Sequence, residues 1–268
     1  MKANPAGLFT RRTAALSIAF GAIAMALLYI PIIGLVLLSF SAQPLSGIPW
    51  PLTLEWYASL FAGNNAQWIG PLGTSVAIGL IVSAAATFVA LLVGRALPLV
   101  KRRGGILAAY LSVLVMPGIL VGIAVLIFYR GLLGFRTGFW SVALVHFIWA
   151  LPFALLCILL VAVRFDRRLL EAAKDLGANR YRQFVDIELP LMMPGISASV
   201  FFSFLLSFNE LPRTLYARGG VVTLPYYIWT ASSAHSSQIS LIYALSAVIM
   251  LASFLVTLLA MRLLMRAK

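Results

Sequence analysis

Long, uninterrupted apolar runs are the feature that most limits what this chain can fold into. Hydrophobic residues make up 62% of its 268 residues and charged residues only 10%, whereas a soluble domain carries about 25% charged residues. The runs lack the alternation of apolar and polar positions that a membrane barrel needs, so helices are favoured. The sequence therefore predicts an all-α membrane protein.

A helix needs about 20 apolar residues to cross a bilayer. Six segments meet this length, and we expect spans at about 14–39, 74–97, 105–128, 139–163, 194–214 and 239–261. Prolines such as Pro31, Pro117 and Pro152 lie inside them, but neighbouring helices can satisfy the backbone groups that a proline frees. We expect one transmembrane domain over residues 1–268.

The distribution of basic residues orients these spans. Six spans put both chain ends on one side of the membrane, and 16 of the 20 Lys and Arg residues fall on that side: Lys2, Arg11, Arg12, Arg95, Lys101, Arg102, Arg103, Arg164, Arg167, Arg168, Lys174, Arg180, Arg182, Arg262, Arg266 and Lys268. The other side has Arg130, Arg136, Arg213 and Arg218. Since cytoplasmic loops carry the excess of positive charge, both termini are predicted to be cytoplasmic.

This topology also accounts for the net charge of +13. A nucleic-acid-binding function is not indicated, because the basic residues are scattered over separate loops without a recognised binding motif. The chain shows no catalytic triad, metal cluster or carboxylate pair, and Cys157 is its single cysteine. It also lacks the G-x-x-x-x-G-K-[ST] phosphate loop. We expect a protein that is not an enzyme and binds no cofactor or metal itself.

Two outer loops contain apolar and aromatic residues. The loop at about 40–73 carries Trp50, Trp56, Tyr57 and Trp68, which suit the membrane surface. It predicts an interfacial helix at about 54–61, a docking surface for a soluble partner, or both. The loop at about 212–238 contains GGVVTLPYYIWT, which predicts a segment that re-enters the membrane edge or lies on it.

Charge concentrates in the predicted inner loop at about 164–193, which holds five of the seven acidic residues. Residues 169–176 have helical composition, and Gly177 stands where a C-terminal cap belongs. Asn179 can cap a second short helix at about 180–188, which Pro190 and Pro194 are expected to stop. The result is a helical hairpin beneath the membrane, and its apolar residues need something to pack against.

The same loop fits the pattern E-A-A, three residues, G, nine residues, I-x-L-P. Its seven fixed positions are Glu171, Ala172, Ala173, Gly177, Ile187, Leu189 and Pro190. This pattern resembles the signature of binding-protein-dependent ABC transporter permeases, and the resemblance extends over about 70–262. It implies a type I ABC importer permease fold, in which this hairpin inserts into a groove on an ATPase subunit. Tyr181 and Phe184 would be further anchors of that contact.

The resemblance also implies partners. These are two ATP-binding cassette subunits that hold ATP and Mg, a second permease subunit that is expected to be a different chain, and a periplasmic substrate-binding protein. The location would be the bacterial inner membrane. TLPYYIW at 223–229 resembles the spermidine/putrescine-type subgroup, which favours a polyamine-like cation. Permeases for iron, phosphonates and opines belong to the same subgroup and remain alternatives.

Polar residues inside the spans are few. Ser199, Ser203 and Ser207 follow an i, i+4, i+8 spacing that puts them on one helix face, with Asn209 and Glu210 at its outer end. They are candidates for the translocation pathway or for helix packing. Glu210 can instead pair with Arg213, and His146 is a packing residue or a proton relay. The scarcity of intramembrane acids disfavours an ion-coupled transporter; a non-transporting scaffold is the third possibility.

Overall fold

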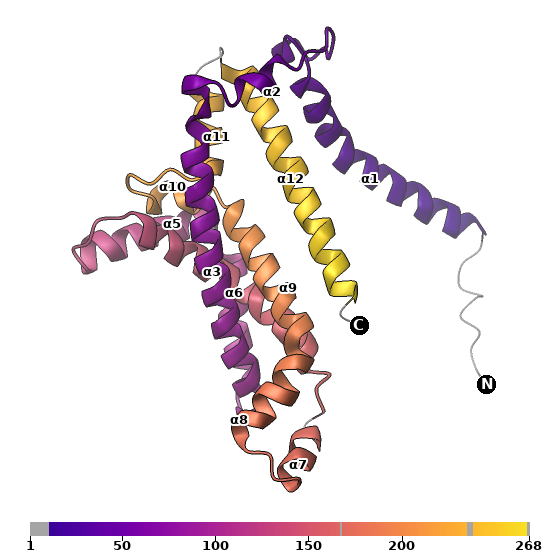
Figure 1. The fold of residues 1–268 in the computed structure, drawn as a ribbon, viewed down its shortest axis with the longest axis vertical. Helices are drawn as coiled ribbons and strands as arrows, with labels where there is room; N and C mark the ends of the chain where they lie inside the picture. Colours follow the sequence, from indigo (N-terminus) through magenta and orange to yellow (C-terminus); the bar gives the residue numbers. More distant parts are fainter. Residues whose placement is uncertain (1–10, 167, 235–237, 267–268) are drawn as a thin grey trace. The chain divides into compact units, whose positions relative to one another are not determined.

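The computed structural model describes residues 11–166, 168–234 and 238–266 (Figure 1). Lys2, Arg167 and Lys268, which entered the charge count above, lie outside the described residues. The described chain is helical apart from turns, short loops and one isolated bridge between Ser41 and Leu52, which confirms the all-α prediction. Its internal contacts define two units, Met1–Ala66 with Ala231–Ser253 and Gln67–Thr230 with Phe254–Lys268.

Five helices are long and apolar enough to cross a membrane: Ala14–Ser39, Asn65–Leu99, Phe139–Ala162, Arg180–Phe208 and Ile239–Arg262. They correspond to five of the six expected spans. The remaining expected span, at about 105–128, is a bent pair of helices, so the described residues hold six spans if that pair counts as one.

The first unit contains α1 (Arg11–Ser39), η2 (Pro44–Ser46), α2 (Glu55–Ser59) and the first part of α12 (Ile239–Arg266). The interfacial helix expected at about 54–61 corresponds to α2. Trp56 Nε1 donates a hydrogen bond of 2.8 Å to the carbonyl of Ser41, and the Tyr57 hydroxyl lies 2.5 Å from Ser39 Oγ. Phe40 stacks on Tyr57. These contacts fold the loop after α1 back on itself.

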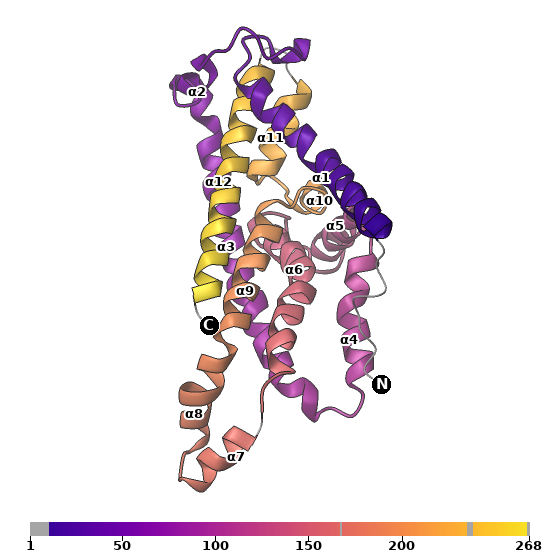
Figure 2. The same ribbon diagram turned by 90° about the vertical axis from the view of Figure 1, so that its right-hand side faces the viewer.

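The core of the second unit is formed by α3 (Ile69–Ala96), α6 (Phe139–Ala162) and α9 (Leu189–Phe208), which pack side by side (Figures 1 and 2). Its buried residues are mostly small and β-branched: Ile78, Val82, Ala86, Ala90, Val142, Ala143, Ala150, Ala154, Leu155, Ile158 and Met192. Small residues allow helices in a bilayer to approach closely. A Cβ atom on Gly195 would lie 3.1 Å from the carbonyl oxygen of Cys157, so α9 meets the backbone of α6 there.

The expected third span is broken. α4 (Arg103–Ser112) continues into η5 (Val113–Val115), and α5 (Gly118–Ile127) begins after Pro117 at an angle of 101° (Figure 2). The segment expected as one span at about 105–128 is therefore a bent helix pair. Proline disfavours helical conformation at the residue before it. Met116 accordingly has ψ 130°, and the helix stops there.

Contacts of α5 with α10 (Thr214–Ala217) and α6 stabilise the bent arrangement. Val121 and Val125 of α5 pack against Val145 and Ala217. A Cβ on Gly122 would lie 2.5 Å from the carbonyl oxygen of Arg213, so only a glycine lets α5 approach this backbone without a shift. The bend is thus built into the packing of the second unit.

One prediction about proline was wrong. We expected Pro190 and Pro194 to stop the short helix after Asn179, but α8 (Arg180–Arg182), η7 (Gln183–Glu188) and α9 run on as one helix, Arg180–Phe208. Pro190 lies in the first turn of α9, where proline is tolerated. The π-helical turn η7 directly before it widens the helix. Pro194 is accommodated inside α9, which ends at Phe208 and not near 214.

The loop expected to re-enter or lie on the membrane forms α11 (Leu224–Ala234). Pro225 occupies its first turn, and the backbone N–H of Leu224 donates a 2.8 Å hydrogen bond to Ser75 Oγ of α3. Gly219 has a positive φ of 55°, and a Cβ there would lie 2.2 Å from the carbonyl oxygen of Thr137. The Gly-Gly pair therefore makes a close turn before α11.

The packing of α9 on α6 predicts that Gly195→Leu destabilises the second unit. Its side chain would collide with backbone and with Val161, and overpacking of this kind costs about 1–3 kcal/mol. The matched control is Gly73→Leu, at an exposed position of α3 where nothing lies within 4 Å of the added Cβ. Thermal unfolding in detergent should show a lower midpoint for Gly195→Leu only; equal midpoints would contradict the packing role.

Candidate functional site

The E-A-A segment folds as a helical hairpin at one end of the α3–α6–α9 core (Figure 1). Its first arm is α7 (Arg168–Asp175), and Gly177, two residues after its end, has a φ of 85°. The N–H of Ala178 bonds to the carbonyl of Ala173, and that of Gly177 bonds to Lys174, which is the Schellman pattern. The predicted cap at Gly177 is confirmed.

The second arm begins at Asn179. Its side-chain oxygen accepts a 2.9 Å hydrogen bond from the N–H of Arg182, which confirms the predicted N-cap. Gln183 Nε2 donates to the carbonyl of Ala178 and closes the turn from the other side. Local hydrogen bonds of capping and turn residues therefore define the hairpin without help from the bundle.

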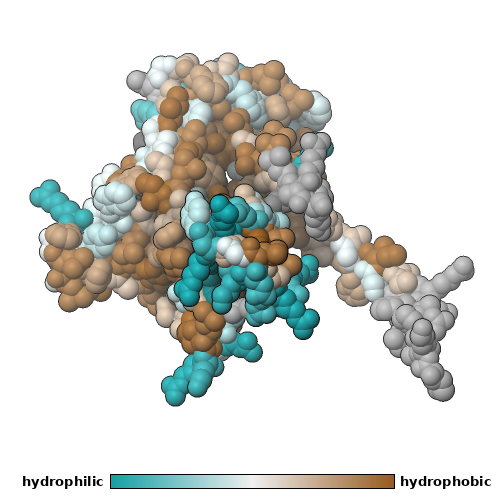
Figure 3. Space-filling model, turned by 60° about the horizontal axis from the view of Figure 1, so that its bottom comes forward, coloured by the Kyte–Doolittle hydropathy of each residue, from teal (hydrophilic) through white to brown (hydrophobic). Residues whose placement is uncertain are grey.

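The tip of the hairpin exposes apolar side chains among charged ones. Seen from the hairpin end, hydrophilic residues gather around scattered hydrophobic ones (Figure 3). Leu176 is 89% exposed and Tyr181 is 73% exposed. Tyr181 was a predicted anchor, whereas Leu176 was missed, although a leucine directly before the capping glycine in a charged loop was a usable signal.

The other expected coupling residues divide between the two sides of the hairpin. Glu171, Ala172, Gly177 and Pro190 are exposed, whereas Ala173 is buried and Phe184, Ile187 and Leu189 are partly buried. Exposed Glu171 and Ala172 are adjacent to the buried Ala173, so the E-A-A triplet presents one face outward and packs the other inward. The partly buried members belong to the base of the second arm.

An ion pair joins this base to α3. Arg95, in the last turn of α3, donates from Nε to Glu188 Oε1 at 2.6 Å and from Nη2 to Oε2 at 2.8 Å. Its guanidinium also lies over the ring of Phe184, 4.4 Å from the centroid. Sequence reasoning missed this contact because the two residues are 93 positions apart; opposite charge at two inner helix ends was the available signal.

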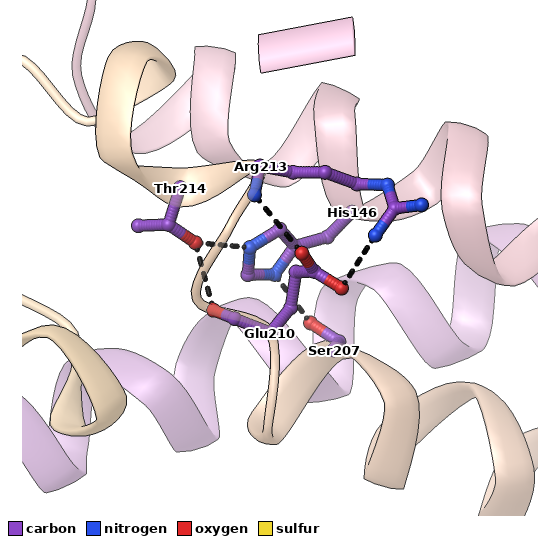
Figure 4. A network of polar contacts seen from close by, with 5 residues as sticks. All are labelled: His146, Ser207, Glu210, Arg213 and Thr214. Carbon is purple, nitrogen blue, oxygen red and sulfur yellow. Dashed lines mark hydrogen bonds and ion pairs between the residues drawn. The ribbon is translucent and has the colours of Figure 1, made fainter. Parts of the chain in front are cut away.

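A second polar cluster joins α6, the end of α9 and α10 (Figure 4). His146 Nδ1 is 2.9 Å from Ser207 Oγ, and its Nε2 is 2.8 Å from Thr214 Oγ1. Thr214 Oγ1 in turn donates to the carbonyl of Glu210. His146 is only 1% exposed, so both ring nitrogens are satisfied by neighbouring hydroxyls, as expected of a packing histidine.

Glu210 and Arg213 form the charged part of this cluster (Figure 4). Arg213 donates to the carboxylate from its backbone N–H and from Nη1, both at 3.0 Å. Its guanidinium lies over Trp149, 3.7 Å from the ring centroid. Both residues are 6% exposed. The structure therefore has the Glu210–Arg213 pairing that the sequence left as one of two alternatives.

The three serines on the face of α9 point into the bundle. Ser199 and Ser203 are 0% exposed and Ser207 is 3% exposed; Ser199 bonds to Thr87 of α3 at 2.9 Å. Asn209 is exposed at the end of α9, and its side-chain amide donates to the carbonyl of Leu205. Burial against α3 and α6 favours the packing interpretation of the serines over a pathway lining in this arrangement.

The buried ion pair predicts non-additive mutations. Glu210→Gln or Arg213→Gln alone leaves an unpaired partner in the core and should cost about 3–5 kcal/mol of stability. The double variant removes both charges and should recover part of that loss. Yield of monodisperse protein and its thermal midpoint in detergent measure the effect, with exposed Arg136→Gln as control. Single variants as stable as the control would exclude a structural ion pair.

Comparison of the sequence with known proteins identifies the family of this chain. The sequence profile of the family described as "Binding-protein-dependent transport system inner membrane component" matches residues 86–267, which includes the hairpin and the broken span.

Within the described residues, no group of three His, Cys, Asp or Glu residues could hold a metal ion.

Several relatives carry the names of transport permeases. The spermidine/putrescine transport system permease protein PotC of Escherichia coli (strain K12) is 33% identical over 240 residues, covering 86% of this chain and 89% of PotC. PotC of Haemophilus influenzae is 33% identical over 204 residues, covering 75% and 78%. The putrescine permease PotI of Escherichia coli (strain K12) is 27% identical over 217 residues, covering 76% and 75%. With its profile match and helical architecture, the chain belongs to the family of inner-membrane permease components of binding-protein-dependent transport systems.

Proposed function

We propose that this chain is a permease subunit of an ATP-driven ABC importer of polyamines, and that its α7–α8 hairpin is the docking site for an ATPase subunit. The observation that carries this proposal is a rigidly capped hairpin that exposes Leu176 and Tyr181 at its tip. Large apolar side chains on a small charged hairpin have no core of their own and mark a protein contact. ATP and Mg would bind in the partner subunits.

The second arm provides the mechanical connection. Because Arg180–Phe208 is one helix, a displacement of the hairpin by its ATPase partner is transmitted directly to α9. In alternating access, the two states differ in their contacts with ATP-bound and ATP-free partners, and those differences shift the equilibrium between them. The ATPase cycle would thereby alternate access to the pathway.

Membership of the family supports a proposal for the remaining partners. We assign a second permease subunit, expected to be a different chain, that completes the pathway, and a periplasmic binding protein that delivers the substrate. Both termini would be cytoplasmic, as the excess of basic residues on the hairpin side favours. Of the five candidate pathway residues, Asn209 is the exposed one, so we retain it at the pathway and assign Ser199, Ser203, Ser207 and Glu210 to the bundle.

The substrate assignment is supported by the relatives, whose names specify spermidine and putrescine. In the structure, the carboxylate of Glu210 is already neutralised by Arg213. We therefore propose that Glu210 does not bind the cationic substrate, and that substrate selectivity lies largely in the separate binding protein.

Docking through the hairpin tip predicts that Leu176→Ser and Gly177→Val lose the ATPase subunits during co-purification. Burial of a leucine contributes about 1.5–3 kcal/mol, and valine at a positive φ costs about 1–2 kcal/mol. Two matched controls are available. Leu132→Ser changes a 76% exposed leucine away from the hairpin, and Gly177→Asn keeps a residue that tolerates positive φ. Normal co-purification of both hairpin variants would contradict the docking assignment.

Polyamine import predicts uptake of labelled spermidine or putrescine into proteoliposomes that contain the assembled complex. Uptake should require the binding protein outside and ATP on the hairpin side, and at equal assembly Glu210→Gln/Arg213→Gln should transport like wild type. Excess ferric iron, a phosphonate and an opine serve as competitors to test the alternative substrates. Uptake driven by an ion gradient without ATP would indicate a secondary transporter, and absence of any flux would indicate a scaffold.

A further inference from the structure

The two arms of the hairpin are joined to the bundle in different ways. The second arm continues into α9 as a helix, whereas residues 163–166, which lead from α6 towards α7, form a turn and an irregular segment. A helix transmits a displacement along its axis, and a short irregular segment does so poorly. On backbone connections alone, movement of the hairpin would reach α9 but neither α3 nor α6 directly.

The ion pair at the base of the second arm supplies a connection to α3. Arg95 belongs to the last turn of α3, and Glu188 is the last residue of η7, directly before α9 begins. Both carboxylate oxygens are engaged, at 2.6 and 2.8 Å. A two-point guanidinium–carboxylate contact has a defined orientation as well as a defined distance, so it resists rotation as well as separation.

Phe184 adds a third point of contact. The Arg95 guanidinium lies over its ring at 4.4 Å, and Phe184 is one helical turn before Glu188 on η7. Arg95 therefore contacts two successive turns of the second arm. The Glu188 side chain is 14% exposed, so the pair is largely shielded on the side of the bundle while Arg95 remains in partial contact with water.

Apolar packing around this contact is incomplete. A pocket of about 200 Å³ lies beside the ion pair and is lined by the end of α3, the end of α6, α7 and the start of α9. The four segments leave an opening there, although Met192 in its wall belongs to the core that α3, α6 and α9 share. Beside this opening, the Arg95 contacts with Glu188 and Phe184 join α3 to the hairpin.

We propose that Arg95 is a positioning residue of the hairpin, which through Glu188 and Phe184 makes α3 follow the hairpin together with α9. The proposal rests on the hairpin being the ATPase docking site. Its consequence is that ATP-driven movement displaces two of the three core helices as one body. Without the bridge, the ATPase subunits still dock on the exposed tip, but part of the movement is lost before it reaches α3.

The first test measures coupling in the complete complex in proteoliposomes, with Arg95→Gln, Glu188→Gln and the exchange Arg95→Glu/Glu188→Arg. Co-purification of the ATPase subunits should remain normal. Spermidine transported per ATP hydrolysed should fall about two- to fivefold in each single variant, the range for a partly exposed ion pair, and the exchange should restore at least half of the loss. Arg103→Gln, at an exposed position on the same side, is the control.

The second test does not depend on the substrate. In a Cys157→Ala background, spin labels at Leu99→Cys, beyond the end of α3, and at the exposed Asp186→Cys of η7 report the distance between α3 and the hairpin. With Arg95 present, this distance should be the same in nucleotide-free and vanadate-trapped complexes, and in Arg95→Gln it should change on trapping.

Three results would overturn the proposal. They are an unchanged transport-to-ATP ratio in both single variants, a change of the label distance on trapping while Arg95 is present, and loss of the ATPase subunits from Arg95→Gln complexes. The last result would make Arg95 a docking residue. Failure of the docking proposal itself is recognised separately, because Leu176→Ser would then retain its partners.

Discussion

The close packing of α3, α6 and α9 supports every other feature of the second unit. In a bilayer the hydrophobic effect does not drive helices together, so association depends on van der Waals contact and interhelical hydrogen bonds. Alanines at 86, 90, 150 and 154 and the glycine at 195 bring the three backbones close enough for such contacts. The Thr87–Ser199 hydrogen bond then ties α3 to α9 inside the core.

Two polar clusters lie at the ends of this core and differ in their surroundings. The buried network at the end of α9 consists of Glu210, Arg213, His146 and Thr214, and each of its charges has a partner. The backbone and side chain of Arg213 also pack against α5, directly after the bend at Pro117. The network therefore holds the broken span in place. A buried charge that is already paired is a poor ligand for a passing cation, because binding would require the pair to separate.

The contact at the other end of the core has a different character. Arg95 and Glu188 are partly exposed, lie beside a pocket and connect the end of α3 to the base of the hairpin. An interaction of that kind contributes little to stability, but it determines the orientation of the hairpin relative to α3. Together with the continuous helix Arg180–Phe208 it joins the hairpin to both α3 and α9.

Much of this could be predicted from the sequence because it depends on short-range physics. The lengths of the apolar runs predicted the five helices that can each cross a membrane alone. Gly177 and Asn179 predicted the caps of the hairpin, and the E-A-A pattern predicted the family. Each of these depends on residues that lie within one continuous stretch of the sequence. The pairing of Glu210 with Arg213, three residues apart, was within reach for the same reason.

Only the tertiary structure decided the rest. The sequence showed Pro117 but not whether the chain would bend there. The bent arrangement depends on the packing of α5, at Gly122, against the backbone that leads into α10. It showed a face of serines but not that α3 and α6 bury it. It contained Arg95 and Glu188 without any local reason to join them, because their contact exists only once α3 and α9 have packed. Long-range packing chooses among the partners that local patterns leave open.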